Sequence, residues 1–347
     1  MSTFFTLPVA DVCPLTPSSV AISFDIPKEL KEKFAFKSGQ FLTLKQEIDG
    51  KEVRRSYSIS SHPSDDKLTI GIKKVEGGVF STWAHENIKV GDSIQVMPPA
   101  GHFVFPPSGE AKHIAAFAAG SGITPIMSIA QTVLDSDSDN TFVLVYGNQS
   151  PEETMFLKEI EKISEKYPDR FFVQLLFSRT REDDAIFGRI DGSIVNLITK
   201  NKFKDRRFDH FYLCGPEEMI NEVKDTLNKN GLGNDQIHFE LFTTSQEEDL
   251  SDLEGQTRVE VTLDDEVFTL IMDKKKLVLD AVLSENIDAP YSCQGGVCST
   301  CIARVTEGKA EMVKNQILTD SEIEEGFILT CQSHPITSTL KIDYDDV

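Results

Sequence analysis

The chain has 347 residues, of which 39% are hydrophobic, and this length predicts two or three domains and excludes a single small module. Its 35 basic and 56 acidic side chains give a formal net charge of −21. A chain this acidic lacks the positive charge that broad binding to nucleic acid phosphates requires, and it favours basic partners. The last part is the most acidic, because residues 245–347 carry 8 basic and 22 acidic side chains, a net charge of −14.

The N-terminal segment, MSTFFTLPVADV, contains neither a basic leader nor a long apolar core. No stretch elsewhere approaches the roughly 18 apolar residues that a membrane-spanning helix requires. These features predict a soluble, cytoplasmic protein that has no membrane partner.

Short segments of alternating polar and apolar residues, separated by turns, fill the first part of the chain. We expect strands at 20–26, 40–44, 53–60, 67–73 and 93–97. One short helix is expected over residues 79–86, directly after Gly77 and Gly78. This pattern predicts an antiparallel β-barrel domain over residues 1–108.

A second pattern begins near residue 112, where apolar runs alternate with helical stretches. The apolar runs cover 113–119, 141–146, 171–177, 210–213 and 236–242, and the helical stretches cover 125–134, 152–166, 190–199 and 217–228. Strands that alternate with helices are typical of a doubly wound parallel sheet. We therefore predict an α/β domain over residues 109–244.

An acidic segment, SQEEDLSDLEGQT at 245–257, follows this domain. It is poor in apolar residues and contains no basic side chain, a composition that is typical of a solvated linker. Residues 258–347 then form a third predicted domain, so the chain is predicted to be multidomain.

Four of the six cysteines lie within 39 residues of the third domain: Cys293, Cys298, Cys301 and Cys331. Their C-x4-C-x2-C spacing, with a distant fourth cysteine, is that of plant-type [2Fe-2S] clusters. Two sulfide-bridged irons need two thiolates each, and a loop can supply three of them only if it curls around the cluster. Gly295 and Gly296 are expected to permit that curl by adopting positive φ and directing backbone N–H groups at the sulfurs.

A zinc site and a set of buried thiols are the alternatives for these cysteines. Zinc ligands usually come as paired C-x2-C knuckles, often with His, and no His lies in the thirty residues before Cys331. The spacing therefore favours the iron–sulfur site. Cys13 lies in another domain and is interpreted as a small structural residue.

A glycine-rich turn, FAAGSGITP at 117–125, joins the first strand of the α/β domain to its first helix. Gly120 and Gly122 permit close approach of a diphosphate, and Pro125 suits the first turn of a helix whose N-terminus could hold an anion. The turn is not G-x-G-x-x-G, so an ordinary strand–helix loop is equally compatible.

A second turn, CGP at 214–216, follows the fourth strand of the predicted sheet. It ends at the same edge, where open α/β folds collect ligands. Two glycine-containing turns at one edge indicate a ligand site better than one does. The alternative for Cys214 is a packed thiol at a strand end.

In the barrel, RRSYSIS at 54–60 places Arg55, Tyr57 and Ile59 on one face of a regular strand. An Arg beside a Tyr can pair with a diphosphate and flank a planar ring. An edge strand with a solvated Arg is the alternative.

Together these motifs resemble the ferredoxin-NADP reductase superfamily fused to a C-terminal plant-type ferredoxin, and within it the reductase subunits of phenylacetyl-CoA epoxidases. The likeness covers the whole chain and its domain order. It implies a β-barrel flavin domain, an α/β nucleotide domain and an α+β ferredoxin domain of the β-grasp type. It rests on RSYS at 55–58, EGGVFS at 76–81, PAGHF at 99–103, AGSGITP at 119–125, YGN at 146–148, CGPEEM at 214–219, ELF at 240–242 and the four clustered cysteines.

The resemblance implies roles for residues of the barrel. Arg55 would pair with the diphosphate of FAD, while Tyr57 and Ser58 would line the isoalloxazine ring, with Ser58 close to N5. Gly78 and Ser81 would hold the diphosphate at the start of the short helix. FAD is favoured over FMN on the likeness alone.

The resemblance also places NADPH or NADH at the carboxyl edge of the α/β sheet. The contacts would come from the two glycine turns: Gly120, Gly122, Thr124, Cys214, Gly215 and Pro216. Glu240 and Phe242 would approach the flavin from the end of the last strand. Ser58, Cys214 and Glu240 are thus the candidate catalytic residues. Ser58 and Cys214 would orient the stacked rings and are not expected to act as nucleophiles.

Ser178 and Arg179 follow the third strand, where this superfamily often contacts a 2′-phosphate. Arg is a good bidentate phosphate partner, so this pair favours NADPH over NADH. An ordinary surface Arg is the alternative.

The resemblance therefore implies an NAD(P)H-dependent oxidoreductase that passes electrons through FAD and a [2Fe-2S] cluster to an oxygenase. Hydride would pass from the nicotinamide to the flavin, which would then supply single electrons to the cluster. The acidic last third would dock a basic patch on the oxygenase or hydroxylase component, or would only aid solubility.

Two other functions are compatible with these residues. The chain could serve a different oxygenase, such as a steroid, aromatic-ring or alkane hydroxylase. It could also be a redox sensor or electron carrier whose nucleotide site is unused, although the intact flavin, nucleotide and cluster motifs argue against this.

Overall fold

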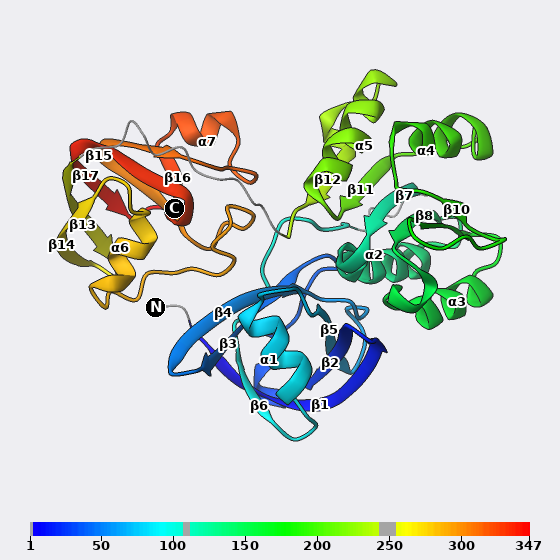
Figure 1. Ribbon diagram of the computed structural model, residues 1–347, viewed down its shortest axis with the longest axis horizontal. Coiled ribbons are helices and arrows are strands. Elements are labelled where there is room, and N and C mark those ends of the chain that lie inside the picture. The colour runs from blue at the N-terminus through cyan, green and yellow to red at the C-terminus, as the bar shows by residue number, and fades with distance from the viewer. Residues whose placement is uncertain (1–2, 107–111, 243–254) are drawn as a thin grey trace. The chain divides into compact units, whose positions relative to one another are not determined.

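Figure 1 shows a computed structural model of the chain, which describes residues 3–106, 112–242 and 255–347. The chain divides into two compact units, one of residues 4–242 and the other containing residues 243–347. The expected boundary at 108 and most of the expected linker, 245–257, lie outside the described residues. Within the described ranges, no helix has both the length and the apolar composition needed to cross a membrane.

The first unit begins with a six-stranded antiparallel sheet of order β4-β3-β6-β1-β2-β5. Its strands are β1 (Phe5–Thr16), β2 (Ser19–Asp25), β3 (Phe41–Ile48), β4 (Lys51–Ser58), β5 (Lys67–Lys73) and β6 (Ser93–Val96). A bridge between Ile59 and Ile70 joins the two ends of this order, which closes the sheet into the predicted barrel.

Apolar side chains fill the barrel, among them Leu7, Ile22 and Leu44, none of which is exposed to solvent. The first strand, β1, was not among the expected strands, because Pro8 and Pro14 interrupt its alternating pattern. The structure accommodates the prolines with two shifts of register between β1 and β2.

The one helix expected in the barrel domain is α1 (Val79–Asn87). The preceding Gly77 has a φ of +72°, a left-handed conformation that glycine adopts without strain. This turn fixes where α1 begins, and its N-terminus belongs to the candidate site.

The second part of the same unit is a six-stranded parallel sheet of order β10-β9-β8-β7-β11-β12. Its strands are β7 (His113–Ala119), β8 (Thr141–Asn148), β9 (Phe171–Phe177), β10 (Ile186–Phe187), β11 (His210–Cys214) and β12 (Ile237–Glu240). In Figure 1, α2 (Ile123–Ser136) and α3 (Leu157–Lys166) lie on one face of the sheet, and α4 (Gly192–Asn196) and α5 (Glu217–Lys229) lie on the other. The predicted doubly wound fold is confirmed.

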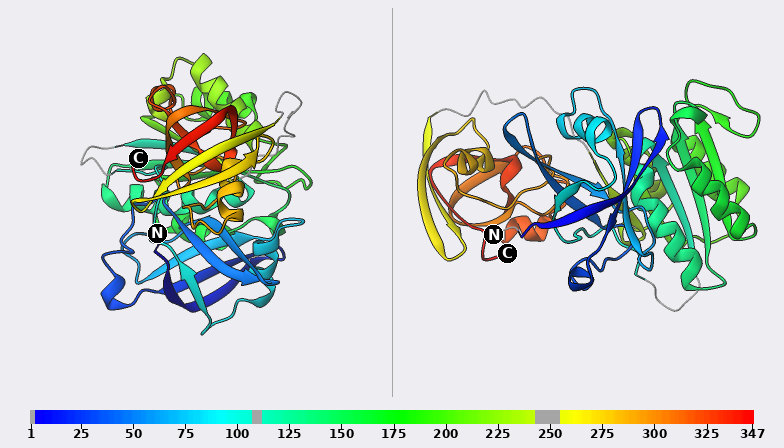
Figure 2. Two further views of the ribbon diagram at one scale, coloured as in Figure 1. Left: turned by 90° about the vertical axis from the view of Figure 1, so that its left-hand side faces the viewer. Right: turned by 90° about the horizontal axis from the view of Figure 1, so that it is seen from below.

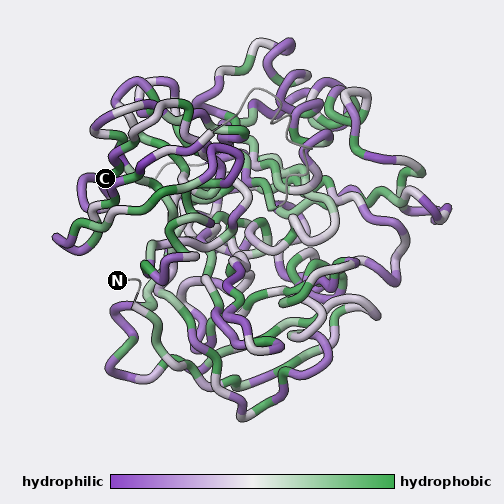
Figure 3. The backbone as a smooth tube through the Cα atoms, turned by 60° about the vertical axis from the view of Figure 1, so that its left-hand side comes forward, coloured by the Kyte–Doolittle hydropathy of each residue, from purple (hydrophilic) through white to green (hydrophobic). Residues whose placement is uncertain are grey.

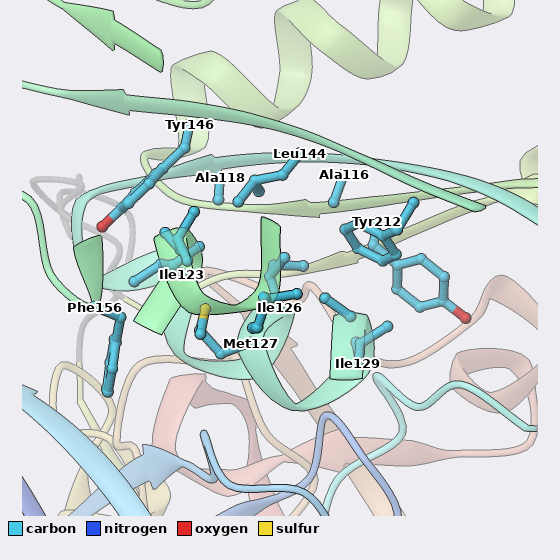
Figure 4. Close-up of a cluster of buried hydrophobic side chains, with 14 of the residues drawn as sticks. Ala116, Ala118, Ile123, Ile126, Met127, Ile129, Leu144, Tyr146, Phe156 and Tyr212 are labelled. Carbon is cyan, nitrogen blue, oxygen red and sulfur yellow. The ribbon is translucent and has the colours of Figure 1, made fainter. Parts of the chain in front are cut away.

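One hydrophobic core of this unit lies between the parallel sheet and α2. Figure 4 shows that Leu144 and Tyr212 lie on the face of the sheet that α2 covers, in the same cluster as Ile123 and Ile126 of that helix. In Figure 3 many of the outer loops of the tube are purple and hydrophilic, whereas green hydrophobic stretches run through its inner parts. This packing fixes the start of α2 at the carboxyl edge of the sheet, where ligands of such folds bind.

The helix expected at 152–166 is interrupted in the structure. A short 3-10 turn (Pro151–Glu153) precedes α3, and Phe156 between them has a left-handed backbone. The break allows Met155 and Phe156 to enter the hydrophobic core that contains α2. Long-range packing therefore decides the conformation here, not local helix preference.

Two further elements differ in extent from their expected ranges. The helix expected at 190–199 continues past α4 as a wider π-helical turn (Leu197–Lys202). The strand expected at 236–242 ends at Glu240, so Phe242 lies beyond the sheet.

The second unit is a five-stranded sheet of order β14-β13-β17-β15-β16 with two short helices. Its elements are β13 (Gln256–Leu263), β14 (Glu266–Asp273), α6 (Val278–Ser284), β15 (Ile302–Met312), α7 (Asp320–Glu324), β16 (Phe327–Leu329) and β17 (Ser333–Asp343). The hairpin of β13 and β14 is yellow in Figure 2, and β13 runs parallel to the red β17, whereas the other pairs are antiparallel. The β-grasp arrangement is confirmed, and it begins at Gln256, two residues before the expected boundary.

Candidate functional site

The flavin-binding residues expected in the barrel lie on β4. This strand pairs with β3 without a register shift, so Arg55 and Tyr57 share a face, while Ile59 lies past its end and is fully buried. Tyr57 packs against Phe80 of α1 with ring centroids 5.7 Å apart. Burial raises the pKa of the Tyr57 phenol well above its ordinary value, although Arg55 opposes the rise, so the phenol stays neutral.

The start of α1 forms a tight backbone cradle. A Cβ at Gly78 would lie 2.4 Å from Ser81 Oγ and 2.5 Å from Val75 Cγ2, so a larger residue would require these two side chains to move. The Ser81 hydroxyl accepts from the Val75 amide at 3.3 Å. The first turn of α1 contains no acidic side chain and no side-chain cap. An anionic diphosphate fits there, because backbone N–H groups and the helix dipole favour negative charge at a helix N-terminus.

Two turns at the carboxyl edge of the α/β sheet contact each other. A Cβ at Gly122 would lie 2.1 Å from the Cys214 carbonyl oxygen, so only glycine permits this approach. Gly120 has a φ of +55°, and its carbonyl accepts from the Tyr146 phenol at 3.0 Å. The structure thus brings the two predicted turns together, and their small residues allow a ligand to approach the backbone.

The other residues of these turns shape the backbone. Thr124 is 1% exposed, and its hydroxyl donates to the Ser121 carbonyl at 3.0 Å. A Cβ at Gly215 would lie 2.8 Å from Met219 Cε, and Pro216 is the N-cap of α5. The contact of Thr124 with a nucleotide stays a prediction, since its hydroxyl already has a backbone partner.

The three candidate catalytic residues come from separate elements and lie close together. Ser58, the last residue of β4, donates from Oγ to Glu240 Oε2 at 3.1 Å. Glu240, the last residue of β12, lies opposite Cys214 in the register of β11 and β12. The hydrogen bond between Ser58 and Glu240 was not expected from the sequence, because the two residues are 182 positions apart.

Burial controls the charges of these residues. It raises the pKa of Glu240 from 4.5 to about 8, although the hydrogen bond from Ser58 opposes the rise. Burial also raises the pKa of the Cys214 thiol, and the charge of Glu240 adds to that effect. At neutral pH we therefore expect a protonated Glu240 and a neutral Cys214. Part of the Glu240 side chain still meets solvent, so the site can hold and exchange a proton beside a reacting ring.

The remaining residues expected in the site are Phe242, Ser178 and Arg179. Phe242 follows β12 and packs against the core of the α/β domain. The amides of Ser178 and Arg179 donate to the Asn148 and Gln149 carbonyls at 3.0 Å, which ties this loop to the end of β8. The Arg179 side chain is exposed, where it can meet a ligand phosphate or only solvent.

In the second unit the four clustered cysteines lie together as free thiols. The Cys298 thiol donates to Cys293 Sγ at 3.1 Å, and Cys331 lies within hydrogen-bonding reach of both Cys293 and Cys301. Hydrogen bonds from Cys298 and then Cys331 lower the pKa of Cys293 toward the thiolate form that binds iron. Among the described residues, no three His, Cys, Asp or Glu side chains are arranged to hold a single metal ion. A two-iron cluster, which takes four thiolates, fits these four clustered sulfurs.

The cysteine-containing loop curls as expected, but with a different backbone. Left-handed φ values fall on Gln294 (+54°) and Gly296 (+70°), whereas Gly295 is not left-handed, contrary to expectation. Gly295 donates its N–H to Cys293 Sγ at 3.4 Å, so an amide does face the sulfur. Gln332 donates from Nε2 to the Gln294 carbonyl at 3.2 Å and stabilises this conformation. Sequence reasoning missed this glutamine, whose only signal is its place beside the fourth cysteine.

Three known domain families match successive parts of the chain. Residues 7–105 match "Oxidoreductase FAD-binding domain", residues 117–225 match "Oxidoreductase NAD-binding domain", and residues 261–335 match "2Fe-2S iron-sulfur cluster binding domain". FAD, a nicotinamide nucleotide and a [2Fe-2S] cluster are therefore the cofactors of this chain, as the resemblance implied.

Curated relatives align with nearly the whole chain. A component of the 1,2-phenylacetyl-CoA epoxidase of Escherichia coli (strain K12) is 37% identical over 352 residues, which cover 99% of each chain. A "3-ketosteroid-9-alpha-monooxygenase, ferredoxin reductase component" of Rhodococcus rhodochrous is 34% identical and covers 97% of this chain and 96% of its own. A "Glycine betaine monooxygenase reductase subunit" of Pseudomonas aeruginosa (strain UCBPP-PA14) is 32% identical over 90% of this chain and 88% of its own.

Solved structures show the same fold. Phthalate dioxygenase reductase covers 98% of both chains with a TM-score of 0.65 at 22% identity. An intact type IV self-sufficient cytochrome P450 monooxygenase covers 98% of this chain and 41% of its own, with a TM-score of 0.71 at 22% identity. With its three cofactor domains and its near full-length relatives, the chain belongs to the family of FAD- and [2Fe-2S]-containing reductase components that transfer electrons to oxygenases.

Proposed function

We propose that this chain transfers electrons from NADPH to a phenylacetyl-CoA epoxidase. The observation that carries the proposal is that one chain combines the group of Ser58, Cys214 and Glu240 with four clustered thiols in a second unit. The full-length similarity to the component of the Escherichia coli epoxidase supports the choice of acceptor.

FAD and the [2Fe-2S] cluster, when bound, supply the redox chemistry, because together they accept hydride and release single electrons. Arg55 would bind the flavin diphosphate through a charge-assisted pair, and the backbone at the start of α1 would donate further hydrogen bonds. The Tyr57 phenol, kept neutral by burial, would lie against the ring with Phe80 behind it.

At the carboxyl edge of the sheet, Gly120 and Gly122 would admit the nicotinamide nucleotide close to the backbone, and Arg179 would pair with its 2′-phosphate. Protonated Glu240 would hold Ser58 Oγ in place at 3.1 Å and keep negative charge away from the incoming hydride. The neutral thiol of Cys214 would pack against the nicotinamide without reacting.

The cluster would be held by the four thiolates of Cys293, Cys298, Cys301 and Cys331, whose sulfurs lie together in the second unit. The Gly295 amide, which faces Cys293 Sγ, would stabilise the added negative charge.

The acidic surface of the second unit would dock a basic patch on the oxygenase. Residues 255–347 alone carry 17 acidic and 8 basic side chains. Helix α7 contributes three of the acids, Asp320, Glu322 and Glu324. Opposite charges accelerate encounter and are screened by salt, so oxygenase-coupled turnover should fall as ionic strength rises while flavin reduction by NADPH should not.

An anaerobic titration of the purified protein, with NADPH and then NADH, tests the proposal directly. The visible flavin and iron–sulfur bands are followed separately, and both should bleach with NADPH at lower concentrations than with NADH. Bands that are present yet stay oxidised with both nucleotides would refute the relay and favour a sensor or passive carrier.

A reductase for a steroid oxygenase is the second candidate, because the Rhodococcus rhodochrous relative is 34% identical. Reconstitution distinguishes the two acceptors. The chain is mixed with an epoxidase component or with a ketosteroid monooxygenase component, and product formed per NADPH consumed is measured. Tighter coupling with the steroid enzyme would overturn our choice of acceptor.

A further inference from the structure

A buried chain of hydrogen bonds connects the C-terminal end of the protein to the cysteine pair Cys301 and Cys331. Tyr344, the residue after β17, donates from its phenol to Thr330 Oγ1 at 2.9 Å. Thr330 Oγ1 donates to the Cys301 carbonyl at 2.9 Å, and the Thr330 amide donates to the same carbonyl at 3.1 Å. Thr330 directly precedes Cys331, so this one residue joins the two cysteines, which lie far apart in the sequence.

The series of hydrogen bonds from Tyr344 to Cys301 is shielded from water along its whole length. Tyr344 is 6% exposed, Thr330 is 0% exposed and Cys301 is 1% exposed. A threonine hydroxyl has one proton, which Thr330 gives to the carbonyl of Cys301, so the Tyr344 phenol is the donor that fixes this rotation. Hydrogen bonds in such a buried network polarise one another. Removing one donor therefore leaves its acceptor without a replacement partner.

Tyr344 is itself held in place by the backbone around it. Its amide donates to the Thr262 carbonyl at 3.0 Å. The next residue, Asp345, accepts from the amides of Asp264 and Asp265 at 2.9 Å. The phenol therefore projects from an anchored segment and can impose its position on Thr330.

We propose that Tyr344 is a positioning residue for the iron–sulfur cluster, which acts through Thr330 on the carbonyl of Cys301. Hydrogen bonds and dipoles around the cysteine ligands set the reduction potential of such clusters. The hydrogen bond that the Thr330 hydroxyl donates, oriented by Tyr344, reduces the negative charge on the Cys301 carbonyl oxygen. It therefore favours the reduced cluster, which is more negative than the oxidised one. The inference rests on the proposed assignment of Cys301 and Cys331 as ligands.

Tyr344→Phe tests the inference, because it keeps the ring and removes the donor. In the full-length, cofactor-loaded protein, a redox titration followed by electron paramagnetic resonance should show a lower cluster potential and an altered signal. We expect the equilibrium constant for cluster reduction to fall about threefold, which is about 28 mV at 59 mV per tenfold for one electron. Thr330→Val should give the same shift, and Thr330→Ser, which keeps the hydroxyl, should not.

The double variant shows whether Tyr344 acts through Thr330. In the Thr330→Val background, Tyr344→Phe should cause no further shift, since the chain is already broken. A matched control is Thr257→Val, which removes a buried hydroxyl that donates to the Thr337 carbonyl at 2.6 Å and leaves the cluster environment intact. It should lower the unfolding temperature and leave the potential unchanged.

Each outcome decides the question. An unchanged potential and signal in Tyr344→Phe, or a full second shift in the double variant, would overturn the inference. Loss of iron from Tyr344→Phe but not from Thr257→Val, with normal flavin reduction by NADPH, would support it. A wild-type protein without a cluster would overturn the ligand assignment, and the inference with it.

Discussion

Gly122→Ala should slow reduction of the flavin by NADPH by about 100-fold. The added Cβ would lie 2.1 Å from the Cys214 carbonyl oxygen and 2.8 Å from the Gly215 amide nitrogen. Both are backbone atoms, so either the turn at Gly122 or the end of β11 must move. Ordinary contact requires a shift of about 1 Å, and a misplacement of about 1 Å in a reacting complex can cost about 100-fold in rate.

Anaerobic stopped-flow absorbance measures this rate, with FAD content and circular dichroism to confirm that the variant is folded. Gly147→Ala is the matched control at the end of the neighbouring strand β8. Its Cβ would meet only the flexible end of the Ile190 side chain at 3.3 Å, so its rate should stay near that of wild type. A folded, flavin-loaded Gly122→Ala protein that is reduced at the wild-type rate would refute nicotinamide binding at this turn.

Three further predictions concern charge and ligands. Glu240 is protonated in the folded protein but ionised in the unfolded chain between pH 4.5 and about 8, so stability should fall as pH rises through this window. Thermal unfolding of Glu240→Gln should lose that slope, and an unchanged slope would contradict burial of the carboxyl. Cys298→Ser should abolish the iron–sulfur absorbance and leave flavin reduction nearly intact, whereas loss of both in stopped flow would refute separate sites. Arg179→Ala should weaken NADPH binding about tenfold and NADH binding little, because a charge-assisted hydrogen bond to phosphate contributes about 1.5–3 kcal/mol. Equal losses for the two nucleotides would remove the reason to prefer NADPH.

Much of the fold was predictable because its signals are local. Alternation marks the strands expected in the barrel, apolar runs mark the main strands of the parallel sheet, and the spacing of four cysteines marks the cluster loop. The break before α3 was hidden, because Met155 and Phe156 continue an apolar helical pattern. Only their packing against the core that contains α2 requires the chain to turn there.

The candidate site was less predictable, because its chemistry depends on contacts between distant residues. Motifs indicated Ser58 and Glu240 separately, but not the hydrogen bond between them or the burial that raises the pKa of Glu240. Tyr344 and Gln332 belong to no motif, and they gain a role only when the sheet of the second unit brings them to the cysteines. Polar residues that act on a site only through other residues form no recognisable motif in the sequence.

The group of Ser58, Cys214 and Glu240 favours neutral side chains, whereas the four clustered cysteines bind iron as anions. We therefore expect substitutions to affect the two sites separately. At the proposed hydride site, burial raises the pKa of both Glu240 and Cys214, so neutral pH leaves neither as an anion. Among the four clustered thiols, hydrogen bonding between the sulfurs lowers the pKa of Cys293 and Cys301 and raises that of Cys298 and Cys331, since close sulfurs share protons. Iron replaces the shared protons because it binds thiolates. The proposed hydride site thus holds neutral side chains whereas cluster binding requires thiolates, so we expect Glu240→Gln to leave the cluster intact, just as Cys298→Ser should leave flavin reduction intact.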